Sequence, residues 1–168
     1  MKFKYRRAEE ADVPGIYEVM RDVERTMENP EMFCSDGPEF IARHIAKEGF
    51  ILLAFFEEQM AAFLIVRYPR GEKDNLGIDI GLQEKELDKV VHMESVAVLQ
   101  KYRGHGIQRE LIKMAEAMLE EQMVHLLATV SPNNRVSLKN FCNLGYEIKL
   151  TKEKYGDKIR HIMYKERF

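Results

Sequence analysis

Apolar and polar residues alternate along this chain with two periods, one typical of strands and the other of helices. Short runs rich in β-branched and aromatic residues predict β-strands at residues 2–7, 50–56, 60–68, 90–98, 126–130, 146–151 and 160–165. Polar residues 57–59 separate the second and third runs, and Tyr155, Gly156 and Asp157 separate the last two. Both breaks predict antiparallel hairpins.

Apolar residues at helical spacing predict helices between these strands. The first follows Glu9, Glu10 and Asp12, and its apolar positions are Val13, Ile16, Val19, Met20 and Val23. A second begins after Asp36, carries Phe40, Ile41 and Ile45, and stops at Gly49. A long helix over 106–122 packs on the sheet through Ile107, Leu111, Met114 and Met118. The last helix covers 136–144 and is capped by Asn133 or Asn134.

Strands and helices alternate, so the predicted fold class is α/β with a mixed sheet and helices on both faces. Residues 27–37 have the composition of a loop. Residues 69–89 leave two structures open, an extended loop or a partly helical excursion. We expect a single domain over residues 1–168, because this length suits one compact core.

The composition excludes some classes of function. Lys and Arg number 26 against 28 for Asp and Glu, so the net charge of −2 disfavours nucleic acid and anionic membranes as partners. No apolar segment approaches the roughly 20 residues that span a bilayer, and the first residues lack a signal segment, which predicts a cytoplasmic protein. Cys34 and Cys142 have neither the number nor the spacing of a metal site or a disulfide framework, so no metal is expected.

A glycine-rich turn lies between the strand over 90–98 and the long helix. Gly104 and Gly106 allow backbone conformations that a side chain would block. The helix behind them presents its N-terminal amides to the turn, an arrangement that binds phosphate. The turn is not a dinucleotide fingerprint, because Arg109 stands where a third Gly or Ala is needed, and it lacks the Gly-Lys-Ser/Thr ending of a P-loop.

Basic residues surround this turn: Lys101, Arg103, His105, Arg109 and Lys113. Taken alone, they could also form a solvated basic rim. The segment VAVLQKYRGHGIQRELI, however, resembles the acyl-CoA-binding motif of the GNAT superfamily of N-acetyltransferases. That motif is Arg or Gln, two residues, Gly, one residue, and Gly or Ala. Arg103 and Gly106 fill its first two fixed positions.

A second signature of the same family is an Asn that opens a helix ending in Gly and an aromatic residue. Asn134, Ser137, Phe141, Gly145 and Tyr146 resemble it, at a fitting distance from the first. The resemblance implies a central, mostly antiparallel sheet of six to seven strands flanked by about four helices. It also implies acetyl-CoA as the cosubstrate.

In this family the backbone amides from Arg103 to Gln108 would hold the pyrophosphate, and the strand edge near Val96 and Val98 would pair with the pantetheine arm. Asn134 would reach that arm as well as cap its helix. The resemblance therefore assigns these cofactor-binding residues: Val96, Val98, Arg103, Gly104, His105, Gly106, Ile107, Gln108, Asn134, Ser137 and Phe141.

Two residues depart from the family pattern. Gln108 stands where the motif ends in Gly or Ala, and its side chain could either obstruct the pyrophosphate or add a donor. Phe141 stands where many members place a Tyr that protonates the CoA thiolate. A thiol with a pKa of about 8.5 is a tolerable leaving group, so water or another side chain could supply that proton.

For deprotonation of an acceptor amine, Glu94 is the candidate base. It lies just before Val96, in a region where some family members use a carboxylate. His92 shares its strand face and could join a proton relay. The alternative roles are an exposed strand carboxylate or a substrate anchor for Glu94, and a structural residue for His92. A backbone amide near Val96 would stabilise the oxyanion.

The leading hypothesis is an enzyme that moves acetyl directly from acetyl-CoA to a primary amine of a small molecule or peptide. Cys142 adjoins the second signature, but no partner for a covalent route can be assigned to it. One alternative is a non-catalytic acyl-CoA-binding or regulatory module, motivated by Gln108 and Phe141. A small nucleic-acid-binding domain is disfavoured by the overall acidity.

Acidic residues cluster in the two regions expected to border the acceptor. They are Glu24, Glu28, Glu31 and Asp36 in the first, and Asp74, Asp79, Glu84, Glu86 and Asp88 in the second. They could attract a cationic amine such as a polyamine, a lysine side chain or an aminoglycoside, or they could be solvated loop surface. Edge strands near the C-terminus are compatible with a homodimer.

Overall fold

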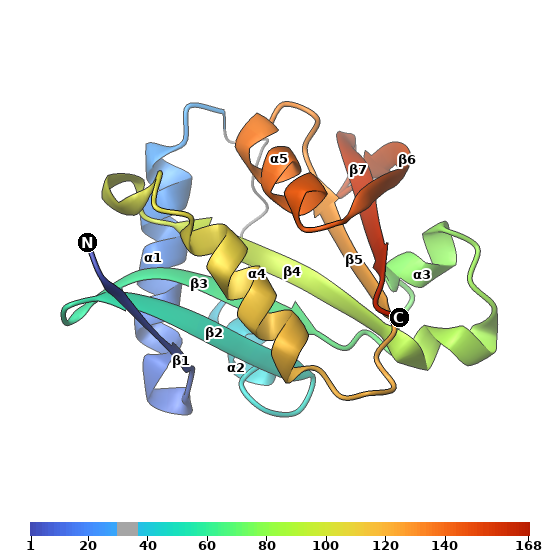
Figure 1. The fold of residues 1–168 in the computed structure, drawn as a ribbon, viewed down its shortest axis with the longest axis horizontal. Coiled ribbons are helices and arrows are strands. Elements are labelled where there is room, and N and C mark those ends of the chain that lie inside the picture. Colours follow the sequence, from blue (N-terminus) through green and yellow to red (C-terminus); the bar gives the residue numbers. More distant parts are fainter. Residues whose placement is uncertain (30–36) are drawn as a thin grey trace.

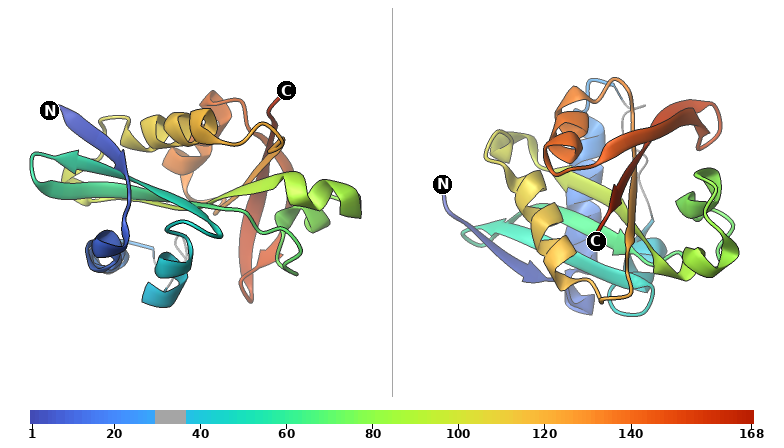
Figure 2. Two further views of the ribbon diagram at one scale, coloured as in Figure 1. Left: turned by 90° about the horizontal axis from the view of Figure 1, so that it is seen from below. Right: turned by 45° about the vertical axis from the view of Figure 1, so that its right-hand side comes forward.

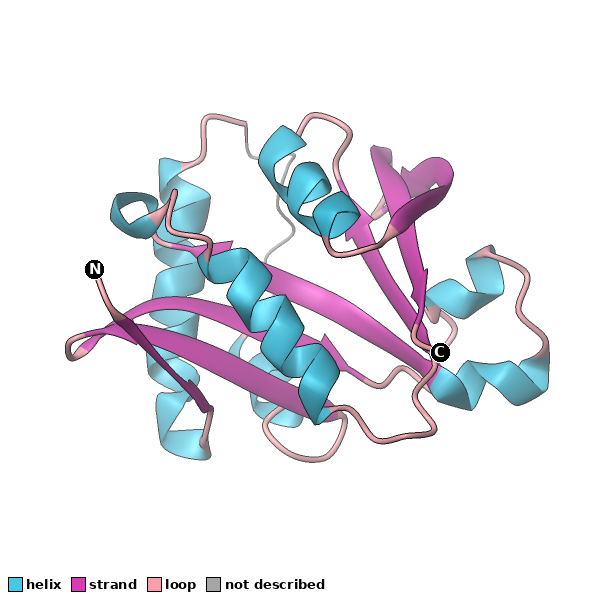
Figure 3. Cartoon of the chain, viewed as in Figure 1, coloured by secondary structure: helices cyan, strands magenta, loops and turns pink. Residues whose placement is uncertain are grey.

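The structure, a computed structural model, describes residues 1–29 and 37–168. In this part of the chain seven strands form one sheet in the order β1-β2-β3-β4-β5-β7-β6 (Figures 1 and 3). The strands are β1 (Phe3–Arg7), β2 (Gly49–Phe56), β3 (Gln59–Arg67), β4 (Val90–Val98), β5 (His125–Val130), β6 (Glu147–Lys154) and β7 (Lys158–Glu166). β4 and β5 are parallel, and every other neighbouring pair is antiparallel. The predicted mixed sheet and both hairpins are confirmed.

Helices cover both faces of the sheet, as the alternation of elements predicted. They are α1 (Val13–Thr26), α2 (Pro38–Arg43), α3 (Leu76–Asp79), α4 (Ile107–Met118) and α5 (Arg135–Asn143), with short 3-10 helices η1 (Glu10–Asp12), η3 (Glu84–Lys89) and η4 (Gln100–Tyr102). Seen along the sheet, α1 and α2 lie on one side and α4 and α5 on the other (Figure 2). None of the described helices has the length and apolar character needed to cross a membrane.

Alternate residues of the central strands supply two cores. On β2, Leu52 and Ala54 belong to the core under α4, whereas Ile51 and Leu53 belong to the core under α1 and α2. This alternation follows from the two-residue period of a strand. Both sides of β2 and β3 are buried, so these strands read as nearly continuous apolar runs.

The long helix is shorter than predicted. α4 ends at Met118, not at residue 122, and Met118 is 42% exposed although its spacing predicted burial. The buried stripe instead runs through Ile107, Leu111, Ile112 and Ala115. Beyond the helix, the Arg167 guanidinium donates to the carbonyls of residues 119, 120 and 123, so tertiary contacts replace further helical turns.

The second predicted helix also stops early. α2 ends at Arg43, and turns lead to Gly49, which opens β2 instead of capping the helix. A Cβ on Gly49 would lie 1.9 Å from the carbonyl oxygen of Val66, so only glycine permits this approach of β2 to β3. Residues Glu31, Cys34 and Asp36, named in the sequence interpretation, lie outside the described residues.

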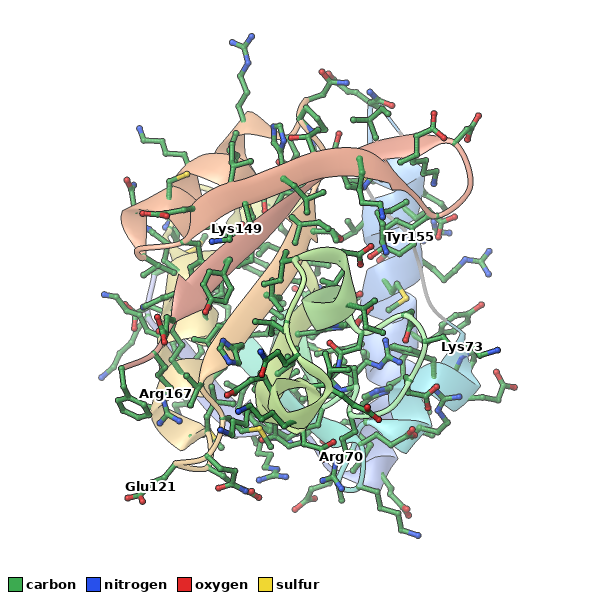
Figure 4. All side chains as sticks on the ribbon, turned by 90° about the vertical axis from the view of Figure 1, so that its right-hand side faces the viewer. Arg70, Lys73, Glu121, Lys149, Tyr155 and Arg167 are labelled. Carbon is green, nitrogen blue, oxygen red and sulfur yellow. The ribbon has the colours of Figure 1, made fainter. Side chains whose placement is uncertain are left out.

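The segment 69–89 is the partly helical excursion, since it contains α3 and η3. Figure 4 shows α3 and η3 in front of β5 and β7, with Lys149 and Tyr155 on the β6–β7 hairpin. Asp79 of α3 accepts from Lys152 Nζ at 2.7 Å and Lys154 Nζ at 2.9 Å. Burial raises the pKa of Asp79, but the two lysine hydrogen bonds outweigh burial and hold that pKa below its usual range. The excursion is therefore fastened to the hairpin.

Candidate active site

Strands β4 and β5 separate next to the candidate base. They pair where residues 90–92 face residues 125–127, and β4 then continues to Val98 along β3 alone. The pairing with β3 shifts between Ile65 and Val66, so Glu94 is the extra residue of a β-bulge. Bulges re-aim side chains, and this one lies two residues beyond the last pair between β4 and β5.

The glycine-rich turn after β4 has the backbone that its sequence predicted. Gly104 has φ 85° and Gly106 has φ 73°, both in the left-handed region that favours glycine. Gly106 is also the N-cap of α4, so the first amides of this twelve-residue helix face the turn. The hydroxyl of Tyr102 donates to Gln59 Oε1 at 2.6 Å and ties the turn to β3.

The basic side chains around this turn make different contacts. Arg103 folds back, and its Nε donates to the carbonyl of Val98 at 3.2 Å. The centroid of the His105 ring lies 5.7 Å from that of the Phe3 ring. A Cβ added to Gly106 would lie 3.3 Å from Nη2 of Arg109, so this guanidinium is the one that stands beside the helix N-terminus.

Gln108 turns its side chain toward α5. Its Nε2 donates to the Ser137 hydroxyl at 2.9 Å, and its Oε1 accepts from Asn140 Nδ2 at 2.9 Å. Both ends of the amide are thus engaged on the neighbouring helix. This orientation leaves the backbone amide of Gln108 in the turn without its side chain in front of it.

The second signature forms the start and core of α5. Asn134 Oδ1 accepts from the backbone amide of Ser137 at 3.2 Å, which confirms the predicted N-cap. Phe141 is 2% exposed and packs edge-on against Tyr146 at 5.0 Å between ring centroids. Tyr146 donates to Glu116 of α4 at 3.1 Å, and burial raises the pKa of this phenol. Phe141 therefore helps to join α5 to the sheet.

These features together fit acetyl-CoA. The pyrophosphate needs unobstructed amides, for which the turn from Gly104 to Gln108 is suited, whereas the Arg103 amide donates to the carbonyl of Gln100 at 3.2 Å. The pantetheine arm needs a strand edge, and beyond residue 92 β4 has no strand pairing with β5 in the described structure. Val96 and Val98, on this part of β4, are half-buried, whereas Ile107 is buried beneath the turn.

Glu94 is part of a compact charged cluster. Its Oε1 accepts from His92 Nδ1 at 3.1 Å and lies 3.5 Å from Arg67 Nη1. Arg67 in turn grips Asp74 through two hydrogen bonds of 2.9 and 2.8 Å. Burial raises the pKa of Glu94, but the hydrogen bond from His92 and the charge of Arg67 outweigh burial and lower that pKa overall. Glu94 is therefore ionised at neutral pH.

A backbone amide orients His92. The N–H of Leu76 donates to His92 Nε2 at 3.0 Å, so Nε2 must be the unprotonated nitrogen and Nδ1 carries the proton given to Glu94. The predicted proximity of His92 and Glu94 is confirmed. The amide of Leu76 was not predicted, because it belongs to the excursion whose structure the sequence left open.

Arg67 and Asp74 complete the cluster. Arg67 gave one signal in the sequence, since a charged residue closes an otherwise apolar strand run. Of the acidic residues proposed to border the acceptor that the structure describes, Asp74 is the one that reaches Arg67. Glu24, Glu28, Glu84 and Asp88 are exposed, and Asp79 and Glu86 pair with basic side chains elsewhere.

His44, at the end of α2, is a further buried polar residue. Its Nδ1 donates to the carbonyl of Phe40 at 2.7 Å, and its ring is fully buried. Within the described structure, Nε2 of His44 has no hydrogen-bond partner. Burial lowers the pKa of His44, and the charges of Glu94 and Arg67 also act on the ring.

The described residues contain no group of three or more His, Cys, Asp or Glu that could hold a metal ion.

The model of the acetyltransferase (GNAT) family matches residues 16–146. No curated protein matches the sequence.

Solved structures share the fold at low identity. The ribosomal-protein-S18-alanine N-acetyltransferase from Escherichia coli is 16% identical, with a TM-score of 0.73 over 98% of this chain and 94% of that one. The yncA protein of Salmonella typhimurium, solved with its cofactor acetyl-CoA, is 16% identical, with a TM-score of 0.71 over 100% and 95% of the two chains. Diaminobutyrate acetyltransferase from Paenibacillus lautus is 16% identical, with a TM-score of 0.67 over 99% and 96%.

Proposed function

Because this chain belongs to the GNAT family of acetyltransferases, we propose that it transfers acetyl from acetyl-CoA directly to a primary amine. The observation that carries the proposal is the place of Glu94. Glu94 lies two positions after His92, the last residue of β4 that pairs with β5. The same strand leads on to the glycine-rich turn. A cosubstrate held by that turn and by the free edge of β4 would bring its acetyl group to this point.

The charge of the cluster favours a cationic acceptor. One guanidinium, that of Arg67, is shared by the carboxylates of Asp74 and Glu94. With His92 neutral, the cluster therefore carries one net negative charge. A primary ammonium beside Glu94 would neutralise that charge and offer three hydrogen-bond donors.

We infer the following proton path. The acceptor ammonium gives one proton to Glu94, and the neutral amine then attacks the thioester carbonyl. The new C–N bond forms as the C–S bond breaks. The positively charged nitrogen then loses its second proton through water to the departing CoA thiolate, since Phe141 has no proton to give. The backbone amides of Gly104 to Gln108 hold the pyrophosphate, and the β4 edge at Val96 and Val98 positions the pantetheine arm.

The identity of the acceptor is a matter for experiment. Two structural neighbours of equal identity to this chain are named for different acceptors, the alanine of ribosomal protein S18 and L-2,4-diaminobutyric acid. We therefore propose a small-molecule or peptide amine, without choosing between them on similarity.

A thiol-release assay with acetyl-CoA tests the proposal against diamines, polyamines, free amino acids, aminoglycosides and peptide N-termini. We expect release that depends on one amine class, with the acetylated amine identified by mass. Methylation of the acceptor to its quaternary ammonium is the matched substrate control and should abolish transfer. Binding of acetyl-CoA without transfer to any of these amines would contradict the proposal.

A further inference from the structure

We propose that Asp74 is a positioning residue for this reaction: it takes the two short hydrogen bonds of the Arg67 guanidinium, so that Glu94 keeps only a longer contact with Arg67 and its carboxylate stays available to the acceptor ammonium. The inference rests on the proposed function for its catalytic meaning. Its structural basis, the competition of two carboxylates for one guanidinium, can be measured without turnover.

The distances show which carboxylate holds Arg67. Nη1 and Nη2 donate to the two oxygens of Asp74 at 2.9 and 2.8 Å, whereas the contact of Nη1 with Glu94 Oε1 is 3.5 Å. Paired bonds from a guanidinium to one carboxylate are the stronger and more directional arrangement. The Arg67 side chain is 8% exposed, so it needs a charge partner, and Asp74 supplies the closer one.

The chain around Asp74 is built to hold it in place. The next residue, Asn75, is fully buried and uses its whole amide. Its Oδ1 accepts from the amide of Gly77 at 2.8 Å, and its Nδ2 donates to the carbonyls of Arg70 and Leu87 at 2.7 and 3.1 Å. Asn75 thus fixes the backbone between Asp74, which holds Arg67, and residue 76, whose N–H orients His92.

Four ionisable groups from four elements act on Glu94. His92 of β4 donates to it, Arg67 of β3 attracts it, and Asp74 of the excursion repels it. His44, the residue that follows α2, interacts electrostatically with Glu94. Of these, Asp74 is the one whose removal would shift Arg67 toward Glu94, because it is the competing partner of that guanidinium.

Loss of the Asp74 charge should therefore slow acetyl transfer in two ways. Arg67 would turn to Glu94 as its remaining carboxylate, which lowers the pKa of Glu94 further and makes it a poorer proton acceptor. The cluster would also lose its net negative charge and its attraction for an ammonium ion.

The direct test is a titration of the Glu94 carboxyl by carbon-13 NMR, with its signal assigned by its loss in Glu94→Gln. We expect the pKa of Glu94 to be lower in Asp74→Asn than in the wild type and close to the wild type in Asp74→Glu. Asp88→Asn is the matched control, since Asp88 is an exposed aspartate of the same excursion. An unchanged or raised pKa in Asp74→Asn, or an equal fall in Asp88→Asn, would overturn the inference.

A second variant covers the case in which Asp74→Asn fails to fold. Arg67→Met removes the guanidinium itself while keeping an apolar stem of similar length. The inference then requires the opposite shift, a rise in the pKa of Glu94. A fall or no change in Arg67→Met would contradict it.

Kinetics give the catalytic readout once an acceptor is known. In Asp74→Asn we expect kcat/KM for the amine to fall about tenfold, with acetyl-CoA affinity unchanged, and recovery in Asp74→Glu. If the role of Asp74 were purely structural, kcat/KM for the amine and the affinity for acetyl-CoA would fall together. If no amine is acetylated, the proposed function fails, while the carboxyl titration still decides whether Asp74 controls Glu94.

Discussion

The side-chain amide of Gln108 donates to the hydroxyl of Ser137 at 2.9 Å and accepts from Asn140 at the same distance. It therefore ties the first turn of α4 to α5. Where the family motif has Gly or Ala, this chain has a cross-link between the two helices that follow β4 and β5. The residue that departs from the motif does not obstruct the turn in this conformation.

Gln108→Ala should therefore weaken acetyl-CoA binding instead of improving it. The variant leaves the buried Ser137 hydroxyl without this partner and frees α5 relative to the turn, at a cost of about 1 kcal/mol. If that cost falls on binding, the dissociation constant for acetyl-CoA rises about fivefold in calorimetry. Gln83→Ala, at an exposed glutamine, is the control. Tighter binding by Gln108→Ala would show that the side chain obstructs the cosubstrate.

Gly106→Ala tests the backbone of the turn. With φ at 73°, an alanine there is strained by about 1 kcal/mol, and its Cβ would press on the Arg109 guanidinium. We expect lower stability and at least severalfold weaker acetyl-CoA binding. Gly71→Ala is the matched control, because a Cβ there meets nothing within 4 Å. Equal effects of the two substitutions would rule out a special role for the turn.

Arg167 should matter for stability although it lies far along the chain from α4. Its guanidinium donates to three carbonyls beyond the end of α4, at 2.7 to 3.2 Å. Hydrogen bonds from a charged group contribute about 1.5–3 kcal/mol, so Arg167→Ala should lower the melting temperature by about 3–12 °C. Arg70→Ala is the control, since both arginines lie at the surface in Figure 4. A shift no larger than that of Arg70→Ala would mean that the capping contacts add nothing.

The sequence was most informative where the structure depends on neighbouring residues. The strand runs, the Gly104–Gly106 turn and the Asn134 cap depend on residues within a few positions of each other. The pair of His92 and Glu94 was predictable for the same reason, since the two residues lie on one strand.

The rest of the site joins distant positions. Arg67 meets Glu94 across 27 residues, and the amide of Leu76 meets His92 across 16. Both contacts depend on the path of the excursion, which is set by burial of Asn75 and by pairing of Asp79 with β6. No local period encodes such a path. The predicted length of α4 was wrong for a similar reason, because contacts with the distant Arg167 decide where the helix ends.

Glu94→Gln tests the candidate base. We expect acetyl transfer to fall by about 10²- to 10⁴-fold, because the amide cannot accept the proton, while acetyl-CoA binding stays unchanged. Glu58→Gln, in the exposed turn between β2 and β3, is the matched control. The measurement is kcat/KM for the amine across pH, together with calorimetry for acetyl-CoA. Turnover equal to that of the wild type at every pH would remove Glu94 as the base.

His44 should make stability depend on pH. Burial lowers the pKa of His44 in the folded protein below its ordinary value of 6.5, so the unfolded chain binds more protons between these two pKa values. The contribution of His44 to the free energy of unfolding should therefore be fully present above about pH 6.5. It should be lost as the pH falls from about 6.5 through the folded pKa of His44. Glu48, Glu94 and Arg67 also act on the ring, and their charges modulate the effect.

The His44→Asn variant isolates this contribution, since asparagine does not titrate and keeps an amide donor near the position of Nδ1. We expect the unfolding free energy of the variant, measured in urea at pH 5 to 8, to change less with pH than that of the wild type. The carboxylates titrate in both proteins, so the difference between the two curves reports His44. Parallel curves would mean that His44 has the same pKa in the folded and the unfolded chain, and would contradict the prediction.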